Sequence, residues 1–149
     1  MIVRRTSVFP AKREDVFRLL QRPETLQTVA APYAYFVPAD GQTDGEWQAG
    51  NESSYYFRLF GFIPFGIHTI HIERIDIDMI QSREHNRQVP VWDHKIMLRD
   101  LGGRTEYTDE VEIEAGWKTI FIWLWAEAFY AHRQRKWIRL LQSGKTTGK

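Results

Sequence analysis

Residues 91–115 read VWDHKIMLRDLGGRTEYTDEVEIEA, two alternations of apolar and polar residues separated by a pair of glycines. Such alternation is typical of a β-strand with one buried face, because successive side chains point to opposite sides of the backbone. Gly102-Gly103 is a two-residue hairpin signal, since glycine readily adopts the positive φ that tight hairpin turns need. The stretch therefore predicts two antiparallel strands, Val91–Leu101 and Arg104–Ala115.

The alternation also places one carboxylate on an apolar face. Asp109 shares its parity with Tyr107 and Val111, whereas the opposite parity of this strand is polar throughout. A turn at the two glycines sets Ile96 opposite Asp109 and His94 opposite Val111, which makes His94 and Asp109 diagonal neighbours on one face. Because a lone buried carboxylate is costly, we expect the two side chains to share a hydrogen bond or one bridging water.

Two interpretations of this pair stay open. As a functional pair, His94 and Asp109 would orient a ligand or move a proton, as a general acid or base does. As a structural pair, they would only satisfy each other in the core. No nucleophile or third group accompanies them in the pattern, so the sequence does not separate the two interpretations.

The rest of the chain extends the same architecture. Five further strands are predicted: Ile2–Phe9, Tyr33–Val37, Ser53–Phe60, Ile67–Ile75 and Ile80–His85. Two short helices, Ala11–Leu20 and a second one that ends at Val29, follow the first strand. Lys118–Gln142 contains no glycine or proline and predicts one long helix. We therefore predict an α+β domain in which a curved antiparallel sheet of about seven strands wraps around the long C-terminal helix.

The segment Trp117–Ala131 is apolar on nearly every face of that helix. A membrane span needs about 20 uninterrupted apolar residues. Here Lys118 and Glu127 interrupt the run and His132 ends it, so no span is predicted. A helix that is apolar all round but too short to span is usually buried in its own protein. We expect the sheet to cover this segment and to leave space beside it.

Composition narrows the class of protein further. A chain of 149 residues suits one domain, which we assign to residues 1–142, with residues 143–149 as a disordered tail. A net charge of +1 argues against nucleic acid as a partner. The absence of cysteine excludes disulfides, thiol nucleophiles and cysteine-ligated metals. The first residues lack the apolar run of a signal peptide, so we expect a cytoplasmic protein. Aromatic residues make up 14% of the chain, which hints at a large apolar interior or a cavity.

Three other patterns favour structure over chemistry. His68 and His71 lie three apart in a strand and point to opposite faces, so we predict no metal site and no cofactor. The basic stretch His132–Arg139 indicates a solvated helix end rather than a nucleic-acid patch, because acidic residues elsewhere balance its charge. The segment Gly61–Gly66 reads as an apolar turn, and whether it forms a lip of a cavity or a cap on the core stays open.

The element order resembles that of the helix-grip superfamily known as SRPBCC. The resemblance starts with TSVFPA (residues 6–11) and DVF (residues 15–17) and covers nearly the whole chain, up to about Leu141. The superfamily includes START-like lipid carriers, relatives of the birch-pollen allergen and polyketide cyclase/dehydrase-like proteins. Because it hosts carriers as well as enzymes, the resemblance implies a fold and an internal cavity for a hydrophobic or amphipathic ligand, and no single activity. Local matches are Gly61–Gly66, Trp92–His94, Tyr107–Val111 and Phe129–Trp137.

We therefore predict binding of a hydrophobic or aromatic small molecule, lipid- or polyketide-like, between the sheet and the C-terminal helix. Two alternatives remain: a polyketide cyclase/dehydrase-like enzyme in which His94 and Asp109 transfer protons, and an accessory interaction protein whose own aromatic side chains fill the cavity. No oligomeric state is predicted. The expected ligand-binding residues are Tyr55, Phe57, Ile70, Trp92, His94, Ile96, Tyr107, Asp109, Val111, Phe121, Trp125 and Phe129.

Overall fold

The structure, a computed structural model, describes residues 1–39 and 48–143, so the predicted tail beyond Ser143 lies outside the described residues. The predicted order of strands and helices is confirmed, with most boundaries within two residues of those expected. The elements are β1 (Ile2–Phe9), α1 (Arg13–Leu20), α2 (Pro23–Ala30), β2 (Ala34–Pro38), β3 (Glu52–Leu59), β4 (Ile63–Ile75), β5 (Met79–His85), β6 (Val91–Asp100), β7 (Thr105–Glu114), the 3-10 turn η1 (Gly116–Lys118) and α3 (Thr119–Gln142).

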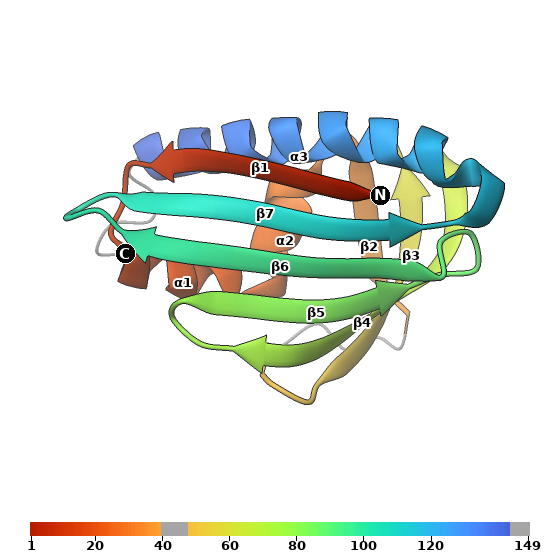
Figure 1. Ribbon diagram of the computed structural model, residues 1–149, viewed down its shortest axis with the longest axis horizontal. Helices are drawn as coiled ribbons and strands as arrows, with labels where there is room; N and C mark the ends of the chain where they lie inside the picture. The colour runs from red at the N-terminus through yellow and green to blue at the C-terminus, as the bar shows by residue number, and fades with distance from the viewer. Residues whose placement is uncertain (40–47, 144–149) are drawn as a thin grey trace.

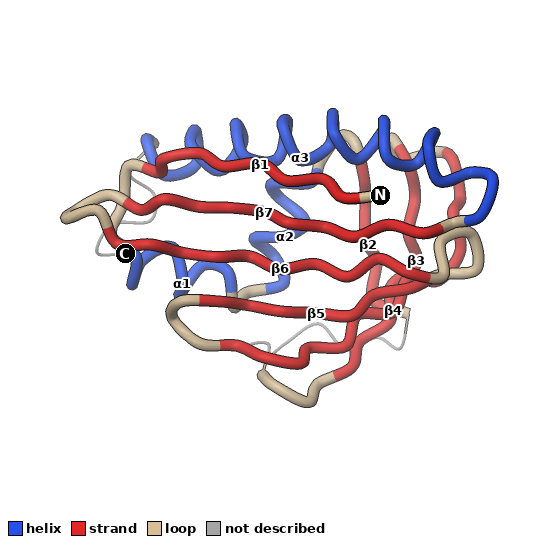
Figure 2. Tube along the Cα trace, in the orientation of Figure 1, coloured by secondary structure: helices blue, strands red, loops and turns tan. Residues whose placement is uncertain are grey.

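The seven described strands form one sheet in the order β1-β7-β6-β5-β4-β3-β2, and every neighbouring pair is antiparallel. The sheet curves, so that α3 runs along its concave side and the strands pass in front of α1 and α2 (Figures 1 and 2). Irregular pairing in β3–β4 and in β4–β5 adds local bending, because an extra residue on one strand kinks it. This is the predicted α+β helix-grip architecture.

One face of α3 packs on the first and the last strand of the sequence, β1 and β7, which are neighbours in the sheet. The Trp123 indole donates to the carbonyl of Ile2 at 2.9 Å, and the Gln134 amide donates to the carbonyl of Arg5 at 2.9 Å. Farther along, Trp137 stacks on Phe9 with ring centroids 5.5 Å apart. The helix is therefore held against β1 and β7, and it stands away from β3, β4 and β5 on the other side.

The apolar segment at the start of α3 is not covered on every side, contrary to the expectation. Trp117 is 82% exposed and Phe121 is 64% exposed, and Ile120 and Leu124 are more than half exposed. A single curved sheet covers only one face of a helix, so the opposite face remains outside. Within the described ranges, none of the helices combines the length and apolarity that a membrane crossing requires.

The predicted turn Gly61–Gly66 is mostly strand. Only residues 60–62 form the turn, and β4 begins at Ile63. Phe65 and Gly66 together oppose Phe57 as a bulge, in which Gly66 takes a φ of +88°. The sequence reads as a turn because it contains two glycines and a proline, but in the structure Gly66 supplies the positive φ of the bulge.

Candidate functional site

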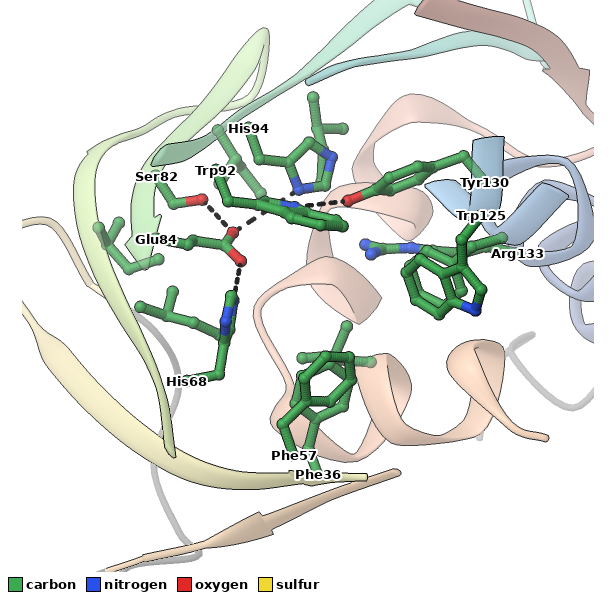
Figure 3. Close-up of a pocket in the computed structure, with 16 residues that line it drawn as sticks. Phe36, Phe57, His68, Ser82, Glu84, Trp92, His94, Trp125, Tyr130 and Arg133 are labelled. Atoms are coloured by element: carbon green, nitrogen blue, oxygen red, sulfur yellow. Dashed lines mark hydrogen bonds and ion pairs between the residues drawn. The ribbon is translucent and has the colours of Figure 1, made fainter. Parts of the chain in front are cut away.

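A cavity lies between the concave face of the sheet and α3 (Figure 3). The empty space among its lining atoms, its opening included, is about 620 Å³, which is an upper limit for a ligand. Its walls are mainly aliphatic and aromatic, with a polar cluster on β4, β5 and β6 and one arginine on α3. The lining residues are Leu26, Phe36, Phe57, His68, Ile70, Ile72, Ile80, Ser82, Glu84, Trp92, His94, Ile96, Trp125, Phe129, Tyr130 and Arg133.

The structure brings seven of the twelve predicted residues to the cavity wall. They are Phe57, Ile70, Trp92, His94, Ile96, Trp125 and Phe129. Four others are buried but do not line the cavity: Tyr55 on β3, which packs with Ile70 and Ile72, and Tyr107, Asp109 and Val111 on β7, where α3 packs directly on the strand. Strand alternation identified their inward side correctly, but a residue on the inward side reaches the cavity only where the helix leaves room.

Phe121 was predicted in the cavity, and that prediction is wrong, because its side chain is 64% exposed. The buried face of α3 runs through Ala126, Phe129 and Tyr130. Phe121 precedes Ala126 by five residues, and at about 100° per residue this places it about 140° away around the helix. Its position is therefore on the outer side of α3.

The predicted His94–Asp109 neighbourhood is present, with the expected register. Ile96 pairs with Asp109 and His94 with Val111, and the His94 Nε2 lies 2.7 Å from Asp109 Oδ1. Asp109 is fully buried, and the Gln134 amide donates to its other oxygen at 3.0 Å. His94 lines the cavity, and Asp109 holds it from behind.

This environment favours the charged forms of both groups. Burial raises the pKa of Asp109, but the hydrogen bond from His94 and the positive charges of His94 and Arg133 outweigh burial, so the pKa is lowered. Burial lowers the pKa of His94, but hydrogen bonds to Asp109 and Glu84 outweigh it, so the pKa is raised. The environment therefore favours an ion pair of the two buried residues.

Glu84, which the sequence interpretation missed, is the second carboxylate at this site. The Ser82 hydroxyl donates to it at 2.6 Å, His68 Nε2 lies 2.8 Å from its Oε1, and His94 Nδ1 lies 3.8 Å from its Oε2 (Figure 3). Burial raises the pKa of Glu84, but the hydrogen bonds with His68 and His94 more than reverse this and lower it. His94 thus stands between two ionised carboxylates.

The tautomer of His68 follows from its neighbours. The Asn86 side-chain oxygen accepts hydrogen bonds from the backbone amides of Gln88 at 2.9 Å and Val89 at 2.8 Å. The amide nitrogen of Asn86 therefore faces His68 Nδ1, at 3.0 Å, and donates to it. Because Nδ1 accepts, the proton of His68 is on Nε2, which donates a hydrogen bond to Glu84.

Arg133 is a charged cavity residue that the sequence interpretation also missed. It was read as part of a solvated helix end, but it is only 6% exposed and lines the cavity. It lies four residues after Phe129 and four before Trp137, on the buried face of α3. Its guanidinium carbon lies 5.6 Å from the centre of the Tyr130 ring. This helical spacing is the signal that identifies Arg133 as inward.

The aromatic walls carry few polar groups. The Trp92 indole donates to the Tyr130 hydroxyl at 3.1 Å, and burial raises the pKa of Tyr130. Trp125 stacks on Phe129 with ring centroids 4.7 Å apart. Across residues 1–39 and 48–143, no group of three or more histidine, cysteine, aspartate or glutamate side chains has the arrangement of a metal site.

Solved structures of the same fold confirm the predicted SRPBCC-like helix-grip architecture. A protein from Arthrobacter aurescens has a TM-score of 0.75 at 14% identity, covering 95% of this chain and 86% of its own. An AHSA1-like protein from Aeromonas hydrophila has a TM-score of 0.70 at 10% identity, covering 100% and 97%. A START superfamily protein from Mycobacterium smegmatis has a TM-score of 0.70 at 9% identity, covering 95% and 97%. Identities this low establish the fold alone.

Comparison of the sequence with family models finds one family. The model described as "Domain of unknown function (DUF8410)" matches residues 7–141. No curated protein matches the chain.

Proposed function

The chain belongs to the DUF8410 family, and we propose that it binds a hydrophobic small molecule with an aromatic or lipid-like body between the sheet and α3. The observation that carries this proposal is the cavity itself, an apolar space with aromatic walls and one localised polar cluster. Such an arrangement is typical of ligand pockets, in which apolar contacts supply affinity and a few polar groups set orientation. A ligand there would also supply the dispersion contacts that empty space denies to the lining atoms.

The aromatic walls favour a flat or slender ligand. Phe36 and Phe57 stack with centroids 4.8 Å apart on one side of the space, and Trp125 lies beside them (Figure 3). Phe57 and Trp125 meet nearly edge to face, with centroids 6.4 Å apart. Ring edges and faces of this kind make favourable contacts with both aromatic and acyl groups.

The alternatives fit less well. Proton transfer by His94 is supported by its place on the cavity wall and its raised pKa. However, Asp109 engages its Nε2 and Glu84 faces its Nδ1, so neither nitrogen is directed at a ligand. A general acid must come within hydrogen-bond reach of the reacting atom, and this argues for binding rather than catalysis. An interaction protein with a filled interior is disfavoured by the empty space.

A neutral fluorescent probe, N-phenyl-1-naphthylamine, tests the proposal. We expect its emission to increase on binding, and the emission of the cavity tryptophans to change, with micromolar affinity of about −8 kcal/mol. Two matched variants test whether the probe binds in the cavity. Ile70 lines the cavity and Ile67, three residues away on the same strand, is 48% exposed. Ile70→Phe should weaken binding, and Ile67→Phe should leave it unchanged.

The outcome is decided by the comparison of the two variants. No enhancement with the wild-type protein, or equal binding by both variants, would contradict the proposal. Native mass spectrometry of the purified protein, followed by organic extraction, would then identify any ligand that the protein carries.

A further inference from the structure

Arg133 presents a buried positive charge that hydrophobic binding alone leaves unexplained. Its guanidinium is directed into the cavity from α3 (Figure 3), and its side chain is more than nine-tenths buried. Its Nε has no hydrogen-bond partner among the described residues. Nor does any carboxylate of those residues lie within ion-pair distance of it. Because an unsatisfied buried donor is costly, this group points to an acceptor that a ligand would bring.

The charges around Arg133 already balance. Glu84 and Asp109 are negative, since their interactions with histidine hold the pKa of each below its usual value. His94 is positive, because its Nε2 lies 2.7 Å from Asp109 and its Nδ1 lies 3.8 Å from Glu84, so both ring nitrogens face carboxylates, which also raise its pKa. With Arg133 itself, the cluster contains two negative and two positive groups. The net charge of this cluster is therefore zero.

The remaining polar groups near the guanidinium add no charge. Burial raises the pKa of the Tyr107 and Tyr130 hydroxyls, which keeps both of them protonated. The Ser82 hydroxyl donates a hydrogen bond to Glu84. His68 is occupied on both sides, by Asn86 and Glu84. Among the described residues that line the cavity, no donor other than Arg133 carries a positive charge that is free of an ion pair. The site can gain a hydrogen bond without changing its charge only through a neutral acceptor.

We propose that the ligand carries an uncharged carbonyl oxygen, of the ketone, ester or quinone class, which accepts a hydrogen bond from Arg133 while its apolar body lies against the aromatic walls. This inference rests on the proposed ligand-binding function and names the chemical class of the ligand. A hydrocarbon would leave the buried Nε donor of Arg133 without a partner. A carboxylate would satisfy this donor, but it would leave one excess negative charge in a site shielded from water. A neutral carbonyl meets both requirements.

Three naphthalenes of nearly the same shape separate these classes. They are 2-acetylnaphthalene, a ketone; 2-isopropenylnaphthalene, a hydrocarbon in which CH₂ replaces the oxygen; and 2-naphthoate, a carboxylate. The dissociation constant of each is measured by calorimetry with the wild-type protein and with Arg133→Met. Arg135→Met is the matched control, because Arg135 lies two residues away on the exposed side of α3.

We expect the wild-type protein to bind the ketone roughly ten- to a hundredfold more tightly than the hydrocarbon, as a hydrogen bond to a charged donor allows. The naphthoate should bind more weakly than the ketone. Arg133→Met should abolish the preference for the ketone over the hydrocarbon, and Arg135→Met should retain the wild-type order of the three ligands.

The possible failures are distinguishable. Equal affinity of the wild-type protein for ketone and hydrocarbon would overturn this inference and leave the proposed binding function intact. Tightest binding of the naphthoate would also overturn it, in favour of an anionic ligand. Binding of none of the three would overturn the proposed function, and this inference with it.

A second measurement does not depend on whether the buried Arg133→Met variant folds. With 2-acetylnaphthalene labelled with ¹³C at the carbonyl, the resonance of the bound ligand should lie downfield of its position in an apolar solvent, because a charged donor polarises the C=O bond. A bound resonance at the position found in an apolar solvent would overturn the inference.

Discussion

Replacing Asp109 by asparagine should destabilise the fold strongly, although the two side chains have nearly the same size. Asp109 is fully buried, and its two oxygens accept from His94 at 2.7 Å and from Gln134 at 3.0 Å. An asparagine offers one acceptor oxygen, so its NH₂ group must face one of these donors. Removing one charge of a buried pair costs about 3–5 kcal/mol. In a chain of about 150 residues this corresponds to a fall in Tm of about 6–20 °C.

The cause is isolated by a double-mutant cycle of His94→Phe and Asp109→Leu. Each single variant leaves one buried partner unpaired, whereas the double variant leaves neither, so we expect the double variant to cost clearly less than the sum of the singles. The free energy of unfolding is measured by urea titration followed by circular dichroism. Repeating the cycle with the affinity for N-phenyl-1-naphthylamine shows whether the pair also affects the cavity.

Two results would refute the reasoning. One is an Asp109→Asn variant whose free energy of unfolding lies within about 0.5 kcal/mol of the wild-type value, the range expected of ordinary surface substitutions. The other is a cycle in which the single costs add, because additive costs mean that the two side chains do not stabilise each other. Strong coupling in stability with unchanged probe affinity would identify the pair as structural.

Three further outcomes follow from the same geometry. Because the pKa of His94 is raised in the folded protein, protonated His94 contributes its full stabilisation below about pH 6.5, and this contribution is lost as the pH rises through the folded-state pKa. Urea titrations above pH 6.5 should therefore show a decline in the free energy of unfolding that the His94→Phe/Asp109→Leu variant lacks. Glu84→Gln should cost about 3 kcal/mol in the same assay, because two histidines lose a buried carboxylate; a cost near zero would mean that the network does not stabilise the fold. Phe129→Ala should cost about 3–5 kcal/mol and Phe121→Ala about 0.5 kcal/mol or less by thermal unfolding, and equal costs would contradict the assignment of their faces.

The His94–Asp109 contact could be predicted because all of its determinants are local. The two residues lie on strands joined by a glycine turn, and the turn sets the register of the strands by itself. Glu84 belongs to the same network, yet its contact with His94 depends on how β5 and β6 pair across the loop that contains Asn86. A signal was present, since Ile80, Ser82 and Glu84 share one parity of β5, but it gains meaning only once the register is known.

Arg133 could not be placed by residue type, because arginine is usually exposed and its neighbours in the sequence are basic. Its spacing from Phe129 and Trp137 indicates the buried face of the helix, and this spacing conflicts with its charge. Burial is tolerated here because the Tyr130 ring lies near the guanidinium and the more distant charges of Asp109 and Glu84 favour its charged form. Such a compromise between charge and packing is expected where a site has a function.

The amino-acid sequence by itself determined the order of the elements, the antiparallel hairpin and the inward side of each strand, because periodicity and turn residues act over a few neighbouring positions. Only the tertiary structure decided which inward residues meet empty space. Val111 on β7 and Phe57 on β3 both point inward. Because α3 rests on β7 and leaves room near β3, Val111 is packed in the core and Phe57 lines the cavity. That difference depends on where a helix settles across strands distant in the sequence, and local patterns carry no information about such distances.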